Sequence, residues 1–136
     1  MRPAQMLITY ATSLVTFLAL DFLWLGFIAR DFYRENMGDL MRVDVRWIPA
    51  VAFYALFVAA VMVFVVVPAT ERLSLARAIL MGGFFGLVTY ATYDLTNLAV
   101  LEGFRTGLAA VDMVWGTALC AVVSAVGYLV ATRLVG

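Results

Sequence analysis

Four long apolar segments constrain the fold of this chain more than any other feature. They cover roughly residues 6–29, 47–67, 78–101 and 108–132. A helix needs about 20 mostly apolar residues to cross the hydrocarbon core of a bilayer, and each segment reaches that length. Hydrophobic residues make up 65% of the chain, whereas roughly half is typical of soluble domains. The sequence therefore predicts an all-α membrane protein, with one domain over residues 1–136 made of four transmembrane helices.

The charged residues exclude several classes of function. Nine arginines balance nine acidic residues, and the chain contains neither lysine nor histidine. No basic stripe with interleaved aromatic residues appears, so a nucleic-acid partner is not expected. Without histidine, the chain lacks an imidazole ligand for haem and a Ser-His dyad. The single cysteine, Cys120, lies in an apolar run and is predicted to be a packing residue. The sequence identifies no cofactor.

The arginines also bear on orientation. Four spans place both termini on one side, together with the connection between the second and third segments. That side carries four arginines and one acid, namely Arg2, Arg72, Arg77, Arg133 and Glu71. The other side carries five arginines and five acids, so the count of cations used by the positive-inside rule is nearly a tie. The side with the termini has only one acid beside its four arginines, which favours termini in the cytoplasm. We therefore expect a multi-pass protein of the cytoplasmic membrane.

The connections differ in length and character. The first, residues 30–46, carries Tyr33, Met37 and Met41 at near-helical spacing and is predicted to form a short helix in the headgroup region, broken near Gly38. The second begins with Pro68, which is expected to stop the second helix. The third, residues 102–107, is predicted to be a tight turn.

An acid recurs at a fixed spacing near one end of every segment. The pattern is Asp-x-x-Trp in three segments and Asp-x-x-Asn in the other. Its members are Asp21 and Trp24, Asp44 and Trp47, Asp94 and Asn97, and Asp112 and Trp115. Residues i and i+3 share one side of a helix, so each acid and its partner are expected to point the same way. The pattern is compatible with a duplicated helical hairpin and a pseudo-two-fold axis along the membrane normal. Coincidence is the alternative.

Three of these acids are predicted to lie deep. Asp21 and Asp94 precede the first charges of the following connections by nine and eight positions, which places both roughly 12 Å inside the membrane. Asp112 is intermediate, and Asp44 is interfacial. A carboxylate within a bilayer costs at least about 2.5–3.5 kcal/mol. Acids at this depth are expected to face a wet cavity, to pair with arginine or to hold a proton. They form either a site for a ligand, an ion or a proton, or only hydrogen bonds that hold helices together.

The third segment carries the most polar stripe within the membrane, with Tyr90, Asp94 and Asn97 at i, i+4 and i+7. The complete set of predicted ligand-binding residues is Asp21, Trp24, Tyr90, Tyr93, Asp94, Asn97, Asp112 and Trp115. The three deep acids lack the tight spacing of a metal site, so no metal ligand is predicted. Gly82 and Gly86 have the small-residue spacing of close helix contacts and are predicted to pack.

Three functions fit these features. In the first, the acids and rings bind or move a cationic or amphiphilic small molecule, or a lipid. In the second, the protein is a lipid-modifying enzyme in which buried aspartates act as acid and base. In the third, it is a non-catalytic membrane subunit or assembly factor, as a homo-oligomer or with another membrane protein. The sequence does not decide whether any reaction is catalysed.

Three stretches also resemble a known family. They read LDFLWLGFIARDFY near the end of the first segment, TYATYDLTNLA in the third and VDMVWGT at the start of the fourth. Together they resemble a family of short bacterial inner-membrane proteins of unknown function, over nearly the full length of the chain. The resemblance implies a four-helix protein of the cytoplasmic membrane. It brings no reaction or cofactor with it.

Overall fold

The computed structural model describes residues 1–42 and 44–136, and all regular secondary structure in them is helical. Four continuous helical stretches, Pro3–Ile28, Trp47–Glu71, Leu75–Val100 and Thr106–Leu134, are long and apolar enough to cross a membrane. They agree with the four predicted segments and confirm the all-α fold. In chain order the elements are α1 (Pro3–Leu23), η1 (Trp24–Ile28), α2 (Arg30–Met37), η2 (Gly38–Leu40), α3 (Trp47–Val61), η3 (Met62–Val66), α4 (Val67–Glu71), α5 (Leu75–Val100), α6 (Thr106–Leu129) and η4 (Val130–Leu134).

Local signals in the sequence set several helix ends. The Ser74 side chain accepts a hydrogen bond from the backbone N–H of Arg77 at 3.1 Å, which caps the start of α5. Gly38 has φ 52° and ends α2, because a left-handed backbone conformation is cheapest at glycine. The break predicted near Gly38 is thereby confirmed. Gly103, with φ 82°, turns the chain between α5 and α6.

Two local predictions were wrong. Pro68 does not stop the second helix, which continues through α4 to Glu71. The backbone N–H of Val67 bonds to the Met62 carbonyl five residues back, so η3 is a wider π-helical turn that accommodates the proline ring. Asp44 does not belong to the second helix, because α3 begins only at Trp47. Asp44 and Trp47 therefore do not lie on one face of a common helix.

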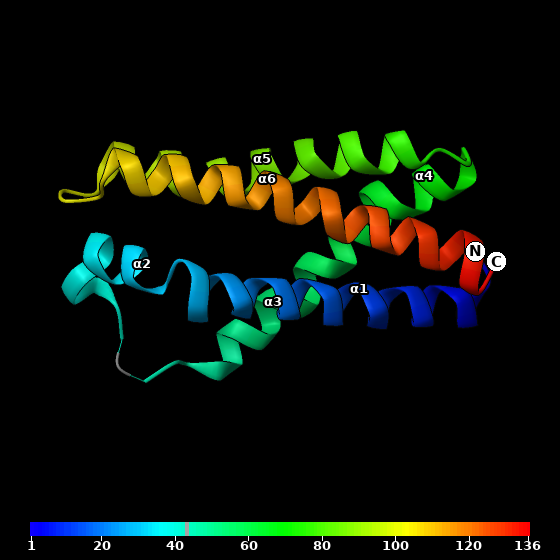
Figure 1. Ribbon diagram of the computed structural model, residues 1–136, viewed down its shortest axis with the longest axis horizontal. Coiled ribbons are helices and arrows are strands. Elements are labelled where there is room, and N and C mark those ends of the chain that lie inside the picture. Colours follow the sequence, from blue (N-terminus) through cyan, green and yellow to red (C-terminus); the bar gives the residue numbers. More distant parts are fainter. Residues whose placement is uncertain (43) are drawn as a thin grey trace.

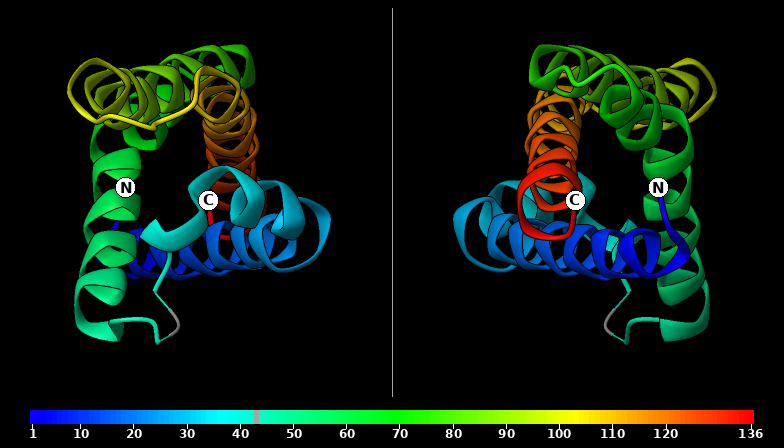
Figure 2. Two further views of the ribbon diagram at one scale, coloured as in Figure 1. Left: turned by 90° about the vertical axis from the view of Figure 1, so that its left-hand side faces the viewer. Right: turned by 90° about the vertical axis from the view of Figure 1, so that its right-hand side faces the viewer.

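The four spans form the four sides of a square when they are viewed along the long axis (Figure 2). α5 and α6 run side by side and antiparallel, α1 lies along α6, and α3 crosses obliquely from α1 towards α5 (Figures 1 and 2). Both termini lie at one end, where the Arg2 guanidinium donates to the Val135 carbonyl at 2.9 Å. α2 lies at the opposite end of the bundle (Figure 1).

Glycines allow α5 and α6 to approach closely. A Cβ atom on Gly86 would collide with the carbonyl oxygen of Gly116, and one on Gly82 would collide with the side chain of Ser124. Close approach of backbones through small residues is the usual way in which transmembrane helices pack. The packing role predicted for Gly82 and Gly86 is confirmed.

The main core lies where α1, α3, η3 and α6 meet. It consists of Phe17, Phe57, Val58, Val61, Met62, Val65, Val66, Leu119, Cys120 and Val123. Large apolar side chains also cover the outside of the spans, such as Ile48 at 86% exposure and Phe27 at 80%. An apolar exterior of this extent is suited to contact with the lipid bilayer.

The two helical hairpins are packed differently. α5 and α6 stay in contact along their length, whereas α3 leaves α1 as it crosses the bundle. The duplicated hairpin and its pseudo-two-fold axis therefore stay a prediction.

Candidate functional site

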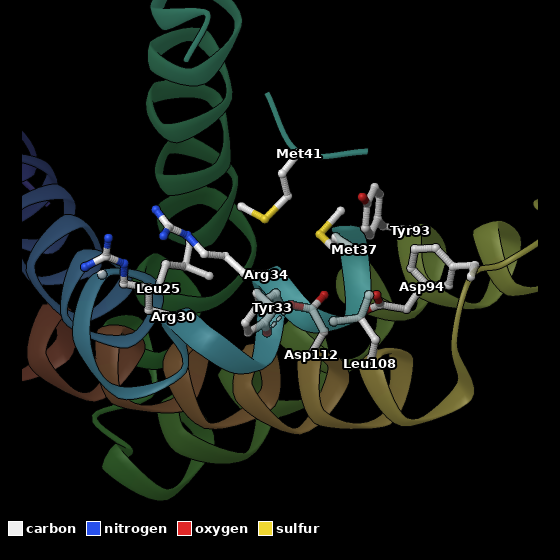
Figure 3. A pocket seen from close by; sticks show the side chains of 12 residues that line it. Leu25, Arg30, Tyr33, Arg34, Met37, Met41, Tyr93, Asp94, Leu108 and Asp112 are labelled. Carbon is white, nitrogen blue, oxygen red and sulfur yellow. Dashed lines mark hydrogen bonds between the residues drawn. The ribbon is translucent and has the colours of Figure 1, made fainter. Parts of the chain in front are cut away.

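Two adjoining cavities, called here the outer and the inner chamber, occupy the half of the bundle nearest to α2. The outer chamber, of about 530 Å³, lies under α2 and is shown in Figure 3. The inner chamber, of about 450 Å³, lies between α1, α3, α5 and α6. Leu25, Tyr93 and Asp112 line both chambers, which therefore lie next to each other. Each volume lies in the range of about 300–1,000 Å³ that holds small organic ligands.

Asp21 lies in the wall of the inner chamber, on α1. Its side chain is buried and accepts hydrogen bonds from the Tyr54 hydroxyl at 2.8 Å and the Trp115 indole N–H at 3.3 Å. These donors come from α3 and α6, so one carboxyl connects three spans. Both are neutral groups, and the negative charge of an ionised Asp21 therefore has no cationic partner in these bonds.

Two tryptophans form a rigid wall beside Asp21. The Trp24 and Trp115 rings are stacked with centroids 4.5 Å apart and planes 6° from parallel. Trp24 begins η1, the π-helical turn directly after Asp21 and α1. π-helical turns of this kind often accompany functional sites. The Trp24 indole N–H donates to the Tyr33 hydroxyl at 3.3 Å, which connects η1 to α2.

Tyr33 attaches α2 to the acidic floor of the cavity. Its hydroxyl donates to Asp112 on α6 at 2.8 Å, and its side chain is buried. Burial raises the pKa of Tyr33 and outweighs the lowering effect of the hydrogen bond from the Trp24 N–H, and the hydrogen bond to Asp112 raises the pKa further. Tyr33 therefore stays a neutral donor throughout the physiological pH range.

Asp94 is the most confined acid in the cavity. Its side chain is 1% exposed, and no N–H or O–H donor among the described residues reaches either of its oxygens. Its carboxyl faces that of Asp112, and the two can form a hydrogen bond when one of them holds a proton (Figure 3). Buried polar atoms are normally paired, so an unpaired carboxyl at a cavity wall is a strong indication of a function there.

The structure brings most of the predicted site residues together. Asp21, Tyr90, Tyr93, Asp112 and Trp115 line the inner chamber, and Asp94 lines the outer one. Trp24 lies behind them, stacked on Trp115. Asn97 is the exception, because it is one turn beyond Tyr93 on α5 and is not among the described residues that line either chamber.

Several residues in or next to the two chambers were not predicted. Tyr54, which lines neither chamber but donates to Asp21, lies in the most apolar segment, where a lone hydroxyl is a usable signal. Arg30, Tyr33 and Arg34 line the outer chamber from α2. Their helical spacing was visible in the sequence, but the side of the bundle on which α2 folds was not.

The arrangement favours binding through carboxylates and aromatic rings. Within residues 1–42 and 44–136, no group of three or more Asp, Glu or Cys side chains could hold a metal ion. Asp94 and Asp112 offer two facing carboxyl groups, which can bind a cation or share a proton.

The four spans define a polytopic α-helical membrane protein. Residues 6–129 match the family described as "Predicted membrane protein (DUF2177)". The chain belongs to this family. No curated protein matches the chain, and neither does any solved structure.

Proposed function

We propose that the protein binds, and in the membrane moves, a cationic amphiphile whose charged group contacts the acidic cavity. The main supporting observation is that Asp21, Asp94 and Asp112 line the two adjoining chambers, and among the described residues none of them is hydrogen-bonded to a cationic side chain. Tyr54 and Trp115 donate to Asp21, Tyr33 donates to Asp112, and no donor in the described part of the chain reaches the Asp94 oxygens. A cation that enters the cavity offsets these charges.

The walls of the cavity suit both parts of such a molecule. Tyr90, Tyr93 and Trp115 present aromatic rings beside the acids, and each ring can add a cation–π attraction of about 0.5–2 kcal/mol. Phe53 and Phe57 from α3 line the inner chamber and suit a hydrocarbon chain. The ligand-binding role of the predicted site residues, other than Asn97, is part of this proposal.

The facing pair of Asp94 and Asp112 also favours a second candidate, a lipid-modifying enzyme. A protonated member of the pair would donate its proton to an alkene carbon or an ether oxygen of a lipid, and the ionised member would stabilise the resulting cation. Water would then add to the cation and return a proton to the pair, so that the alkene is hydrated or the ether is cleaved and the mass of the lipid changes. Mass spectrometry of the purified protein before and after incubation with membrane lipid distinguishes the candidates. A lipid of changed mass supports the enzyme, whereas an unchanged bound amphiphile supports binding.

Native mass spectrometry in maltoside micelles tests the binding proposal with three amphiphiles of equal chain length. We expect dodecylamine, which is a cation at neutral pH, to bind saturably and at least about tenfold more tightly than dodecanol. Dodecanoate should bind more weakly than dodecanol, because its carboxylate meets three acids. Equal binding of the three compounds, or preference for dodecanoate, would contradict the proposal.

We further propose that the protein lies in the cytoplasmic membrane with both termini in the cytoplasm. The cavity mouth and α2 would then face the outer side, since they lie at the end opposite to the termini. The test is labelling of single cysteines with a membrane-impermeant maleimide in spheroplasts. Glu35→Cys on α2 should react directly, whereas Glu71→Cys at the end of α4 should react only after lysis. Both positions are exposed, and Cys120 is buried, so the reverse pattern would overturn this orientation.

A further inference from the structure

We infer that the ligand carries a phosphate as well as an amine, as in a phospholipid with a primary amine in its headgroup. The phosphate would contact Arg30 and Arg34, and the ammonium group would contact Asp94 and Asp112. The inference rests on the proposed function and specifies its ligand.

The first argument is the distribution of charge on α2. Arg30, Tyr33, Arg34 and Met37 are spaced i, i+3, i+4 and i+7, and all four line the outer chamber. The two acids of α2, Asp31 and Glu35, are not among the described residues that line it. α2 thus turns its arginines towards the cavity and its acids elsewhere, which gives an acidic cavity a cationic rim.

The second argument is the separation of the two charges. Figure 3 shows the guanidinium groups of Arg30 and Arg34 on one side of the outer chamber and the Asp94 and Asp112 carboxyls on the other, with Tyr33 between them. A ligand with only a positive charge would leave the arginines without a partner, and a ligand with only a negative charge would be repelled by the acids. A headgroup with both charges can bind the arginines and the acids at once. Arginine is well suited to the anionic end, because its planar fork bonds two phosphate oxygens at once.

The third argument is the route available to an acyl chain. The inner chamber adjoins the outer one at Leu25, Tyr93 and Asp112. Its wall residues Phe53 on α3 and Tyr93 on α5 are 46% and 53% exposed, so the chamber reaches the outer surface of the bundle, which faces lipid. A lipid can therefore place its headgroup under α2 while its chain passes between α3 and α5.

Arginines at helix ends commonly contact the phosphates of the surrounding bilayer without selecting any lipid. Arg30 and Arg34 differ from this case because they line the same chamber as Asp94, a buried carboxyl whose oxygens no N–H or O–H donor among the described residues reaches. A specific site differs from general contact with the bilayer because it selects one kind of lipid, here a lipid that carries both an amine and a phosphate.

Native mass spectrometry in maltoside micelles can compare phosphatidylethanolamine, phosphatidylglycerol and dodecylamine. The first has both groups, the second lacks the amine, and the third lacks the phosphate. We expect phosphatidylethanolamine to bind most tightly. Arg30→Gln with Arg34→Gln should weaken its binding by roughly tenfold or more and leave dodecylamine binding nearly unchanged. The matched control is Arg72→Gln with Arg133→Gln, two exposed arginines at the other end of the bundle.

The outcomes separate the inference from the proposed function. Tight dodecylamine binding with no preference for phosphatidylethanolamine, or with no effect of the Arg30 and Arg34 changes, overturns the inference alone. Failure of every amine to bind overturns both. Displacement of phosphatidylethanolamine by millimolar inorganic phosphate, but not by phosphatidylglycerol, would assign the arginines to a soluble phosphate compound and also overturn the lipid assignment.

Discussion

Replacing both facing acids, Asp94→Asn with Asp112→Asn, is expected to weaken dodecylamine binding strongly while making the protein more stable. Binding should weaken by about 100-fold, which corresponds to about 2.7 kcal/mol, because the amine loses its charged partners. Stability should rise by about 1–3 kcal/mol, since a buried ionisable group is expensive to keep and an asparagine amide can donate to its neighbour. Asp94→Asn alone should have a smaller effect on binding, because Asp112 keeps its charge.

Two measurements on the same variants check this result. Native mass spectrometry gives the affinity for dodecylamine, and unfolding by sodium dodecyl sulfate in mixed micelles gives the stability. Asp44→Asn is the control, since Asp44 is exposed and lies outside the helices. The sign of the stability change is decisive. If the double variant is less stable and still binds, the acids are hydrogen-bonding contacts between α5 and α6, and the site proposal is wrong.

A single methyl group at Gly86 is expected to have the largest effect on folding. The Cβ atom of Gly86→Ala would collide with the backbone of Gly116, which cannot move aside as a flexible side chain can. α5 and α6 must therefore separate, at a cost of about 2–3 kcal/mol. Because α5 carries Asp94 and α6 carries Asp112, the separation should also weaken dodecylamine binding.

Gly83→Ala is a matched control on the same helix. Its Cβ atom would meet its nearest neighbour, the Thr117 methyl group, at an ordinary 3.7 Å. Loss of a helical glycine should leave the protein unchanged or more stable by about 0.5–1 kcal/mol. Unfolding in mixed micelles compares the two variants. Equal stability of Gly86→Ala and Gly83→Ala would show that the close contact at Gly86 does not determine the packing of α5 and α6.

The sequence predicted the spans well, because they depend only on distance along the chain. Runs of about 20 apolar residues define spans whatever their packing. The depth of Asp21 and Asp94 in the membrane stays a prediction. Within the protein, both side chains are buried. Gly82 and Gly86 were predictable for a similar reason, since their spacing places both on one face of a helix.

The features that the sequence did not predict depend on contacts between distant segments, which the spacing of residues along the chain does not specify. The sequence showed a helix in residues 30–46 but not that Tyr33 would bond to Asp112, 79 residues away. Pro68 was misjudged because η3, the turn that accommodates it, has no composition that sets it apart from the surrounding valines. Asn97 fitted the polar stripe of the third segment, yet the described cavity ends one turn before it.

The stacked tryptophans have a consequence for optical spectroscopy. At 4.5 Å, we expect the electronic transitions of Trp24 and Trp115 to couple, whereas Trp47 lies 60% exposed at the start of α3 and outside this pair. We expect this pair to contribute a component of its own to the ultraviolet circular dichroism spectrum. Because Trp115 bonds to Asp21 and Trp24 bonds to Tyr33, this component reports on the acids and on α2 together. The protein thus carries a built-in chromophore beside its cavity, and occupancy can be followed there without an added label.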